Sequence, residues 1–544
     1  MESSVFLFKL REEKHISRER LASGVCTAGE IARFEAGKQE INREIFDILL
    51  QRLGVSPDKL EVVCNWEQCK ESDVLFQFEE LVYRQEGEKA LAVLEQYITP
   101  RAESDRIWKM YACRCHAMYE RYISFDFKKA ERYLVNALEM TLPGWKADEN
   151  QNFSPLSWMR RGRSQWENCL ISTVEMENLL ALAELWLLEE RNGQEIELWL
   201  ENCCAYIQRA FTDEEERAKV LCKCRWLQAD CLLRRGDRKS AFLLCEEALE
   251  LLRDCGISGF MLPLIDRMLD CGGIAEWERQ EKRLKGYRDS LCYARQLAGE
   301  WRPEASVYSS CCKQERHLDS EIFRQERKVR KLTQEDICDG IFETARSLSQ
   351  IEQCRKMLRK KNFEQLMERF GLAKGRFNLN VSTDSFEVLK LDNEFARMSA
   401  KEQLQDMGKI INALKSQLDM EKPENRRMLQ SYELELDWKE QNKSWEELLK
   451  KAVCLLEETY LIRNGCYRVP FREEARLMVD TAILLTKLGR KEEAEQLYRQ
   501  MLGVYKKSKV PERYHYCTQS VIYNNLAKLT NSEELARDRV SVQV

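Results

Sequence analysis

A segment near the start of this chain recurs in its second half, and this repetition constrains the fold more than any other feature. Residues 16–25 (ISRERLASGV) align with residues 332–341 (LTQEDICDGI) at an offset of 316, with apolar residues at matching positions and coincident glycines. One additional residue near Phe342 shifts the offset to 317, after which residues 27–35 align with residues 344–352. The same register then pairs Phe46 with Phe363, Leu49 with Leu366, Arg52 with Arg369 and Gly54 with Gly371. A register kept through consecutive helices predicts an internally duplicated chain.

The composition favours helices throughout. The 544 residues include only 9 prolines and 22 glycines, and 33% of them are charged. Leucine, alanine, glutamate and lysine are plentiful, and all four are good helix formers. The length suffices for roughly three or four ordinary domains, or for fewer domains built from stacked repeats. We therefore expect an all-α protein.

Residues 1–64 have the pattern of a small domain of short helices. Ser17 is a candidate N-cap for the second helix, and Thr27 with Glu30 forms a capping-box pattern at the start of the third. Gly37 fits the left-handed residue that ends that helix. One small core is expected from Leu7, Leu10, Ile16, Leu21, Val25, Ile31, Phe34, Ile45, Ile48, Leu49 and Leu53.

Longer amphipathic helices arranged in pairs follow this domain. The clearest pair runs from Trp226 to Leu249, with Gly236 at the turn and the small residues Ala229 and Ala241 where the two helices would cross. This pair resembles a tetratricopeptide repeat, and a second copy surrounds Gly489. We expect helix-turn-helix domains at 1–64 and 317–380, and tetratricopeptide-like arrays at 72–302 and 384–530. A polar and aromatic insertion at 143–168 interrupts the first array, Pro303 marks a break between the halves, and residues 538–544 form an unstructured tail.

Charge and targeting patterns limit the possible partners and location. The formal net charge is −5, but residues 317–380 carry more basic than acidic residues and residues 1–60 carry equal numbers. A nucleic-acid contact would therefore be local. The start of the chain lacks a signal-peptide pattern, and no apolar run approaches the ~20 residues of a membrane span. We expect a cytoplasmic protein that does not contact membranes.

Chemical motifs are scarce. Some of the 22 cysteines are spaced by two, as in Cys113-Arg114-Cys115-His116 and Cys222-Lys223-Cys224. Zinc sites usually space paired cysteines more widely, and residues i and i+2 of a helix point to different faces. These cysteines are thus expected to be reduced, buried thiols, without a metal site. The four histidines show no acid-base spacing, and no phosphate-binding loop or nucleophile elbow is present, so neither an enzyme nor a cofactor is expected.

Several of these motifs together resemble one regulator family. They are Glu19 to Ala22, Gly24-Val25-Cys26-Thr27, Ile31 to Glu35 with Gly37, and the Gly236 and Gly489 repeat signatures. The chain resembles the XRE-type helix-turn-helix joined to tetratricopeptide-like helices in the peptide-responsive transcription factors of the RRNPP group. The resemblance implies that the helix-turn-helix domains bind operator DNA as a dimer and that the concave face of the array binds a short linear peptide. It also implies asparagines on inner helices that hold the peptide backbone, since an amide both donates and accepts hydrogen bonds. Asn136 and Asn178 are the possible counterparts.

In such a domain the third helix enters the major groove and the start of the second contacts phosphate. The candidate DNA-binding residues of the first copy are Arg18, Thr27, Ala28, Gly29, Glu30, Arg33 and Lys38. Those of the second copy are Gln334, Thr344, Arg346, Ser347, Gln350 and Arg355. Arg33 suits guanine and Glu30 suits cytosine, although an acid near phosphates costs affinity. The second copy has the chemically better groove-facing set.

The second copy departs from the pattern elsewhere. It has Glu326 where Leu10 stands and Cys354 where Gly37 stands. Two interpretations of this copy remain: it binds DNA, or it is a retained fold used for intramolecular pairing. The favoured function is a cytoplasmic DNA-binding transcriptional regulator whose arrays sense a peptide or protein ligand. The chain would then act as a homodimer or as an intramolecular pseudo-dimer on double-stranded DNA. The alternative is a tetratricopeptide interaction or sequestration protein whose helix-turn-helix domains do not bind DNA.

Overall fold

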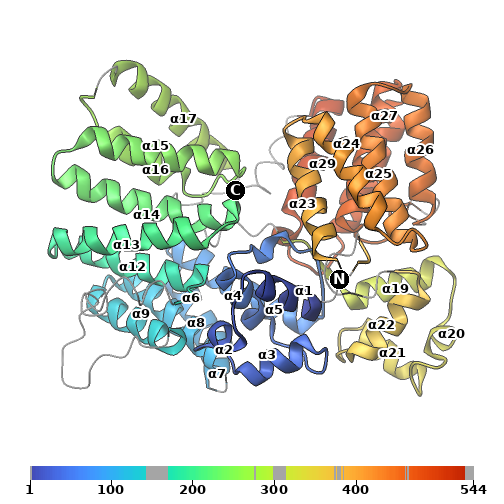
Figure 1. Ribbon diagram of the computed structural model, residues 1–544, viewed down its shortest axis with the longest axis horizontal. Helices are drawn as coiled ribbons and strands as arrows, with labels where there is room; N and C mark the ends of the chain where they lie inside the picture. The colour runs from blue at the N-terminus through green and yellow to red at the C-terminus, as the bar shows by residue number, and fades with distance from the viewer. Residues whose placement is uncertain are drawn as a thin grey trace. The chain divides into compact units, whose positions relative to one another are not determined.

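The protein is all-α, as its composition predicts (Figure 1). The computed structural model describes residues 3–532 apart from 104, 143–168, 275–276, 298–313, 373–374, 376–380, 384, 460 and 462–464. The predicted insertion at 143–168, the break at Pro303 and the expected tail at 538–544 lie outside these residues. None of the described helices is long and apolar enough to cross a membrane.

Contacts divide the chain into two compact units. The first comprises Met1–Leu10, Asp58–Lys70 and Lys313–Gln543, and the second comprises Arg11–Pro57 and Glu71–Cys312. Most of the first helix-turn-helix domain and the first array thus belong to the second unit. The segment predicted as a second helix-turn-helix, and the array predicted after it, belong to the first unit.

The first helix-turn-helix domain begins and ends its helices where the sequence signals predict. Its elements are α1 (Ser3–Glu13), α2 (Arg18–Ala22), α3 (Ala28–Glu35), α4 (Arg43–Arg52) and a single 3-10 turn at Pro57–Lys59. The Ser17 side chain accepts a hydrogen bond from the Arg20 backbone amide, and Thr27 forms a capping box at α3. Gly37 has a φ of +68°. Of the predicted core, Ile45 is half-buried and the other side chains are buried.

The first array stacks helices in antiparallel pairs (Figure 1). Gly236 makes the turn of the clearest pair with a φ of +84°, and Ala229 and Ala241 are fully buried between neighbouring helices. In chain order the helices are α5 (Trp66–Tyr83), α6 (Gly87–Val93) with the π-helical Leu94–Ile98, α7 (Thr99–Ala102), α8 (Arg106–Tyr119) with the π-helical Glu120–Ser124, α9 (Phe127–Thr141), α12 (Thr173–Leu188), α13 (Gly193–Ala210), α14 (Glu214–Arg234), α15 (Arg238–Asp254), α16 (Met261–Asp270) and α17 (Trp277–Leu297).

The second helix-turn-helix segment repeats the helix lengths of the first. It comprises α19 (Asp319–Val329), α20 (Gln334–Cys338), α21 (Ala345–Glu352) and α22 (Lys360–Arg369). These helices have 11, 5, 8 and 10 residues, as do α1 to α4. Residues with a left-handed backbone also recur at matching positions. In the first domain they are His15 (φ +53°), Gly24 (+77°), Gly37 (+68°) and Gly54 (+70°). Their counterparts are Lys331 (+56°), Gly340 (+72°), Cys354 (+61°) and Gly371 (+66°).

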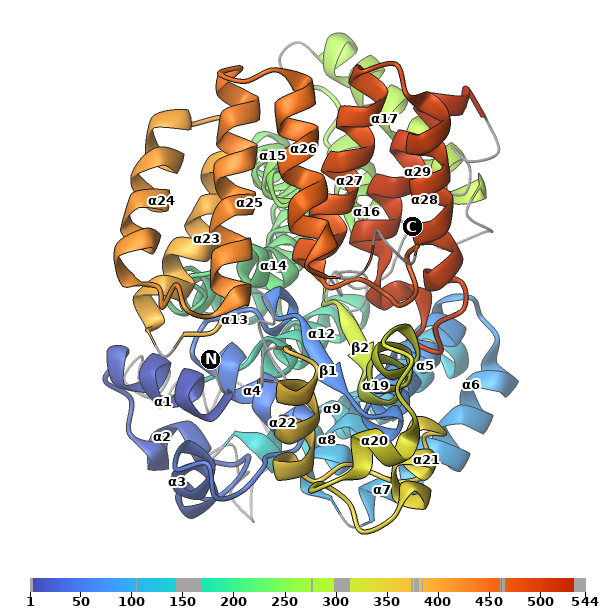
Figure 2. The same ribbon diagram turned by 90° about the vertical axis from the view of Figure 1, so that its right-hand side faces the viewer.

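A short parallel ladder precedes α19 and was not expected from the sequence. Strand β1 (Val62–Cys64) pairs with β2 (Arg316–Leu318), with Val62 opposite Arg316 and Cys64 opposite Leu318 (Figure 2). Val63 of β1 packs in the core of the second helix-turn-helix segment beside Ile322 and Phe323. The ladder therefore fixes a segment from the first half of the chain to the second helix-turn-helix.

Within the described residues the second array has fewer helices than the first, and Figure 2 labels them α23 to α29. Its helices are α23 (Phe386–Ala400), α24 (Leu404–Gln417), α25 (Pro423–Glu440), α26 (Trp445–Glu457), α27 (Arg472–Lys487), α28 (Lys491–Tyr505), a 3-10 turn at Glu512–Tyr514 and α29 (Tyr516–Thr530). The pair predicted around Gly489 is formed by α27 and α28, with Ala482 and Ala494 fully buried between them.

Candidate nucleic-acid interface and ligand cavity

Helix α3 places its predicted DNA-contacting residues unequally at the surface. Gly29, Arg33 and Lys38 are exposed, as is the capping residue Thr27, whereas Ala28 is half-buried. The Arg33 Nε donates to Gln39 Oε1 at 2.6 Å, which orients this guanidinium along the C-terminal end of the helix. The exposed cationic groups of the helix are therefore at its C-terminal end.

Glu30 is engaged at the start of the same helix. Its carboxylate accepts hydrogen bonds from the Thr27 backbone amide at 2.7 Å and from the Thr27 hydroxyl at 2.9 Å. These bonds lower the pKa of Glu30, so its charge is held at the helix N-terminus. A carboxylate held in a capping box is poorly placed to accept from cytosine.

A buried carboxylate positions the predicted phosphate-contacting residue Arg18. Glu35 is 3% exposed in its side chain and accepts from Arg18 Nε at 2.6 Å. It also accepts from Arg11 at 2.6 and 3.0 Å. The Arg18 side chain keeps 40% of its surface exposed. Glu35 thus fixes the start of α2 while leaving a cation at the surface.

Arg52 at the end of α4 holds this domain on the first array. It donates to Glu175 Oε1 at 2.6 Å and to the Thr141 carbonyl oxygen at 2.9 Å, both in the array. It also donates to the Leu21 and Ser23 carbonyl oxygens inside the domain. One buried guanidinium therefore joins the turn between α2 and α3 to two helices of the array.

Two glycines permit this close approach. A Cβ on Gly24 would lie 2.0 Å from the Thr141 carbonyl oxygen, and a Cβ on Gly54 would lie 2.4 Å from that of Ala210. Both distances are far below van der Waals contact. The first helix-turn-helix domain thus packs on the array through backbone at these points.

The second copy repeats the internal scaffold of the first. Arg327 donates to Glu352 at 2.7 and 2.9 Å, as Arg11 does to Glu35. Gln334 donates to Glu352 Oε2 at 2.9 Å, in the position where Arg18 contacts Glu35. Arg369 donates to the Ile337 carbonyl oxygen at 2.7 Å, as Arg52 does to that of Leu21. The buried ion pair between the first and third helices is therefore common to both segments.

Helix α21 presents a more polar surface than α3. Arg346, Arg355 and the capping residue Thr344 are exposed, and Ser347 and Gln350 are half-buried. No side-chain cap bond satisfies the start of this helix within the described residues. Every charged residue of the predicted contact set in this copy is an arginine.

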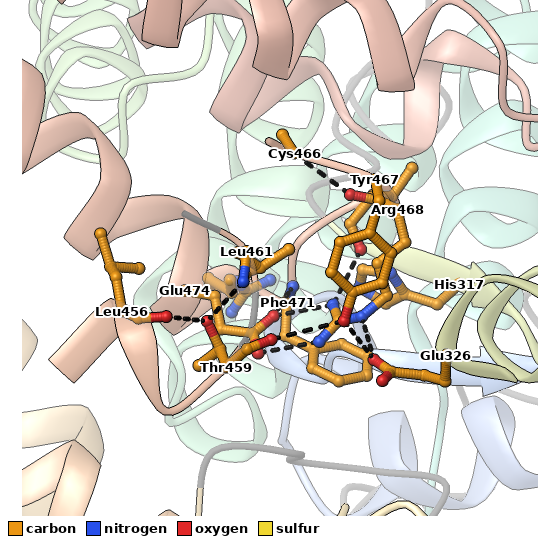
Figure 3. A network of polar contacts seen from close by, with 12 residues as sticks. His317, Glu326, Leu456, Thr459, Leu461, Cys466, Tyr467, Arg468, Phe471 and Glu474 are labelled. Atoms are coloured by element: carbon orange, nitrogen blue, oxygen red, sulfur yellow. Dashed lines mark hydrogen bonds and ion pairs between the residues drawn. The ribbon is translucent and has the colours of Figure 1, made fainter. Parts of the chain in front are cut away.

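The second copy is held on its array by Glu326, the residue that replaces Leu10 (Figure 3). Glu326 is 1% exposed and accepts from Arg468 Nε at 2.6 Å and from the Tyr467 hydroxyl at 3.0 Å. Arg468 also donates to Glu474 at 2.8 and 2.9 Å. Burial opposes ionisation of Glu474, but the Arg468 guanidinium prevails and lowers its pKa. The acidic replacement in the core is thus one end of a buried ionic link to the loop before α27.

The two copies dock through different faces. Cβ atoms added to Gly340 and Gly371 would meet nothing within 4 Å in the described part of the chain, unlike those on Gly24 and Gly54. Arg369 is exposed, whereas Arg52 is buried. The other departure, Cys354, keeps the left-handed conformation of Gly37 and places its sulfur 3.1 Å from Ser320 Oγ.

The inner face of the first array is occupied by its own charged side chains. Arg114 donates to Asn178 Oδ1 at 3.1 Å and to Glu79 at 3.4 Å, and Lys223 donates to Glu177 at 3.3 Å. Among the described residues, the pocket lined by these side chains holds about 30 Å³. Asn178 is fully buried in this network, and the other predicted peptide ligand, Asn136, is exposed on α9. The structure does not bring the two asparagines together in one cavity.

The second array encloses a cavity of about 890 Å³ on one face. Most of its lining residues come from the alternate helices α25, α27 and α29, as expected for the inner surface of paired helices. The lining residues are Glu315, Glu402, Leu404, Glu435, Trp438, Lys439, Gln441, Trp445, Arg472, Ala475, Arg476, Val479, Asp480, Ile483, Cys517, Thr518, Val521 and Asn525.

This lining combines indoles with charges of both signs. Trp438 and Trp445 meet edge to face with ring centroids 6.1 Å apart. Arg476 pairs with Glu435 and donates to Ser431 Oγ at 2.8 Å. Burial raises the pKa of Asp480 to about 7 despite the nearby Arg476. The sequence interpretation missed these residues because it sought asparagines only in the first array. Asn525 of α29 is the asparagine that lines this cavity.

The cysteine pairs flagged in the sequence are buried or half-buried thiols. Cys222 and Cys224 donate to the carbonyl oxygens of Ala248 and Leu200 at 3.4 and 3.5 Å. Burial raises the pKa of Cys115. A different group brings metal-binding atoms together: Glu61, Glu315 and His317, whose donor atoms lie within 4.8 Å of one another.

Comparisons with known proteins bear on the amino-terminal domain. A helix-turn-helix family model matches residues 7–60. No curated protein matches the chain. The crystal structure of Bacillus thuringiensis PlcR in complex with the peptide PapR7 and DNA aligns with 55% of this chain and 99% of that chain, at 13% sequence identity and a TM-score of 0.31. A likeness this weak does not carry a function to this chain. Residues 7–60 are thus similar to the helix-turn-helix family over the segment that α1 to α4 occupy.

Proposed function

We propose that this protein is a DNA-binding transcriptional regulator whose second helical array senses a ligand. The observation that carries the DNA-binding part is the pairing of a helix-turn-helix segment with an exposed arginine on its third helix, Arg33 in α3 and Arg346 in α21. Arginine is the side chain best suited to guanine in the major groove. Arg18 adds a cation at the position where such domains contact phosphate.

We infer that the second copy arose by duplication and contributes a second DNA-reading helix. The equal helix lengths, the matching left-handed residues and the repeated Arg–Glu pair support this origin. Helix-turn-helix dimers read two half-sites. A duplicated chain would carry both readers itself and act as an intramolecular pseudo-dimer.

The ligand of the second array is proposed to be a short linear peptide. The cavity of about 890 Å³ lies within the roughly 300–1,000 Å³ typical of ligand sites. Its arginines suit a carboxylate, its acids suit an amino group, and the Asn525 amide suits a peptide backbone. The charged network of the first array, in contrast, surrounds a space of about 30 Å³.

DNA binding is tested with selected genomic fragments and a titration of salt. The full chain should bind with an affinity that falls steeply with salt, with a slope of about −0.9 per phosphate contacted. Arg33→Ala and Arg346→Ala should each weaken binding by about tenfold, since a lost bidentate base contact costs roughly 1–3 kcal/mol. Arg132→Ala, which removes an exposed arginine of α9, is the matched control and should change nothing. If both variants bind as wild type does, DNA reading by α3 and α21 is wrong.

Peptide binding is tested by selection from a library of short linear peptides, followed by fluorescence polarisation with the selected sequence. Val521 lines the cavity with 46% of its surface exposed, so Val521→Trp should fill the cavity without disturbing the core. This variant should lose the peptide. Leu243→Trp alters a similarly exposed residue of α15 and should retain it. Equal binding by both variants would place the peptide elsewhere.

A sequestration protein is the second candidate. It is favoured by Glu30, which places a negative charge on the helix expected to face DNA. In that case no selected fragment should show steep salt dependence, and the array should still bind its ligand.

A further inference from the structure

Three metal-binding side chains from distant parts of the sequence meet at the β1–β2 ladder. Glu61 precedes β1, Glu315 precedes β2, and His317 is the central residue of β2. Because Val62 pairs with Arg316, the parallel register sets Glu61 beside Glu315. Their exposed fractions are 1%, 1% and 3%, and their donor atoms lie within 4.8 Å of one another.

The hydrogen bonds of this cluster leave donor atoms unused. Glu61 Oε1 lies 2.8 Å from His317 Nε2 and accepts from the Arg472 backbone amide at 2.7 Å. Glu315 Oε1 accepts from the Thr518 hydroxyl. The second oxygen of each carboxylate is buried and has no hydrogen-bond partner among the described residues. A buried polar atom without a partner is costly, so each of these oxygens is suited to a ligand.

A second histidine adjoins the cluster. His515 is 1% exposed, and neither of its ring nitrogens has a hydrogen-bond partner in the described parts of the chain. Its ring centroid is 6.0 Å from that of His317. These two unpartnered nitrogens, so near His317, make His515 a candidate fourth ligand.

The charge balance also favours a cation. The Arg472 guanidinium interacts with both Glu315 and Glu61 and supplies one positive charge against two carboxylates. A divalent ion would add positive charge beside both carboxylates while replacing the hydrogen bond between His317 and Glu61.

We propose that Glu61, Glu315 and His317 bind a divalent transition-metal ion, with Zn²⁺ the best match to one imidazole nitrogen and two carboxylates. Donors at about 2.0–2.2 Å from a tetrahedral ion lie roughly 3.3–3.6 Å apart, so side-chain torsions of the present cluster suffice to close the site. His515 or a water molecule completes the coordination. Glu315 also lines the cavity of the second array, so the cluster borders that cavity.

The site would join two segments that border the helix-turn-helix domains in the sequence. Glu61 follows α4, and Glu315 and His317 precede α19. A bound ion would therefore fasten the β1–β2 ladder and reduce the freedom of both segments. This inference goes beyond the proposed regulator and does not depend on DNA or peptide binding.

Direct metal binding by the full chain tests the proposal. Protein stripped with a chelator is titrated with Zn²⁺ against a chromogenic competitor, and the bound ion is counted by mass spectrometry. Wild type should bind one ion per chain at this site and gain thermal stability from it. Glu315→Gln and His317→Gln should each weaken binding by at least tenfold, since even outer-sphere partners change affinity by about 10–100-fold. His116→Gln, at a half-buried histidine stacked on Tyr133, is the matched control and should bind as wild type does.

Cobalt substitution distinguishes metal binding at this site from metal binding by cysteines. It uses the wild-type protein, so it also tests the proposal if a variant does not fold. Co²⁺ bound by nitrogen and oxygen should give visible d–d bands without the near-ultraviolet charge-transfer band of thiolate coordination. Wild type that gives no such d–d bands, or gives the thiolate band alone, would overturn the proposal. Folded Glu315→Gln and His317→Gln variants that both keep wild-type affinity would overturn it as well.

Discussion

At the residue scale, a buried glutamate stands in the second helix-turn-helix segment where the first has a core leucine. Leu10 is 2% exposed in the first copy, and its counterpart Glu326 is 1% exposed in the second. A buried carboxylate is tolerated only when it is paired, and Arg468, Tyr467 and Arg330 supply the partners. The replacement of leucine by Glu326 is therefore explained by docking on the second array.

Removing this carboxylate should destabilise the first unit. Glu326→Ala leaves Arg468 buried with only Glu474 as a charged partner, and breaking a buried pair costs about 3–5 kcal/mol. Urea denaturation followed by circular dichroism measures the loss. Glu335→Ala, at an exposed acid of α20, is the control and should change stability by less than about 0.5 kcal/mol. Equal stability of the two variants would refute the docking role.

Glu44 should make stability depend on pH. Burial raises its pKa to about 7 from an ordinary 4.5, and its Oε1 has no hydrogen-bond partner among the described residues. The folded state thus holds the proton more tightly than the unfolded state does. Stability should fall as the pH rises from about 4.5 to about 7 and then remain low. Glu44→Gln should flatten this part of the profile and raise the melting temperature at alkaline pH. Glu40→Gln at an exposed position should leave the profile unchanged.

At the element scale, two similar helix-turn-helix segments are held on their arrays by different contacts. The first uses backbone approach at Gly24 and Gly54 together with Arg52. The second uses the ionic link from α19 to the loop before α27. A shared fold therefore does not imply a shared docking face.

The four matched glycines test this difference. All four glycines have a left-handed backbone: Gly24, Gly54, Gly340 and Gly371. An alanine substituted at any of them must adopt this conformation, which costs about 1 kcal/mol of stability. Gly24→Ala and Gly54→Ala must also displace backbone of the first array, so their loss should exceed that of Gly340→Ala and Gly371→Ala by about 1–3 kcal/mol. Denaturation gives the stability, and hydrogen exchange at α9 and α13 reports the loosened contact. Four equal losses would mean that the contact contributes nothing.

At the scale of the whole molecule, the two arrays differ in the use of their inner faces. Arg114, Lys223 and their acidic partners fill the first, whereas the second keeps a cavity of about 890 Å³. Tight packing of paired charges suits a rigid support for the first helix-turn-helix domain. An open, mixed-charge surface suits a ligand.

The proposed duplication and DNA binding predict the stoichiometry of a protein–DNA complex. If α3 and α21 each read one half-site, one chain should occupy an operator with two half-sites. A regulator with a single helix-turn-helix domain per chain needs two chains for such an operator. Light scattering of the purified complex gives its mass. Two chains on the same operator would show that only one copy per chain reads DNA.

The sequence by itself determined the local structure. Thr27, Glu30 and Gly37 specify where α3 begins and ends because capping signals act within one helical turn. The small residues of the two clearest repeat signatures likewise predicted the helix pairs that turn at Gly236 and Gly489.

Only the tertiary structure decided where the functional groups meet. The pairing of β1 with β2, the Glu326–Arg468 link and the cavity around Arg476 join residues far apart in the chain. Asn178 shows the same limit, since its position on an inner helix could be anticipated but its burial against Arg114 could not. Local signals depend on a few neighbouring residues, whereas these sites depend on how whole helices pack, and a single sequence does not encode that pairing in a readable pattern.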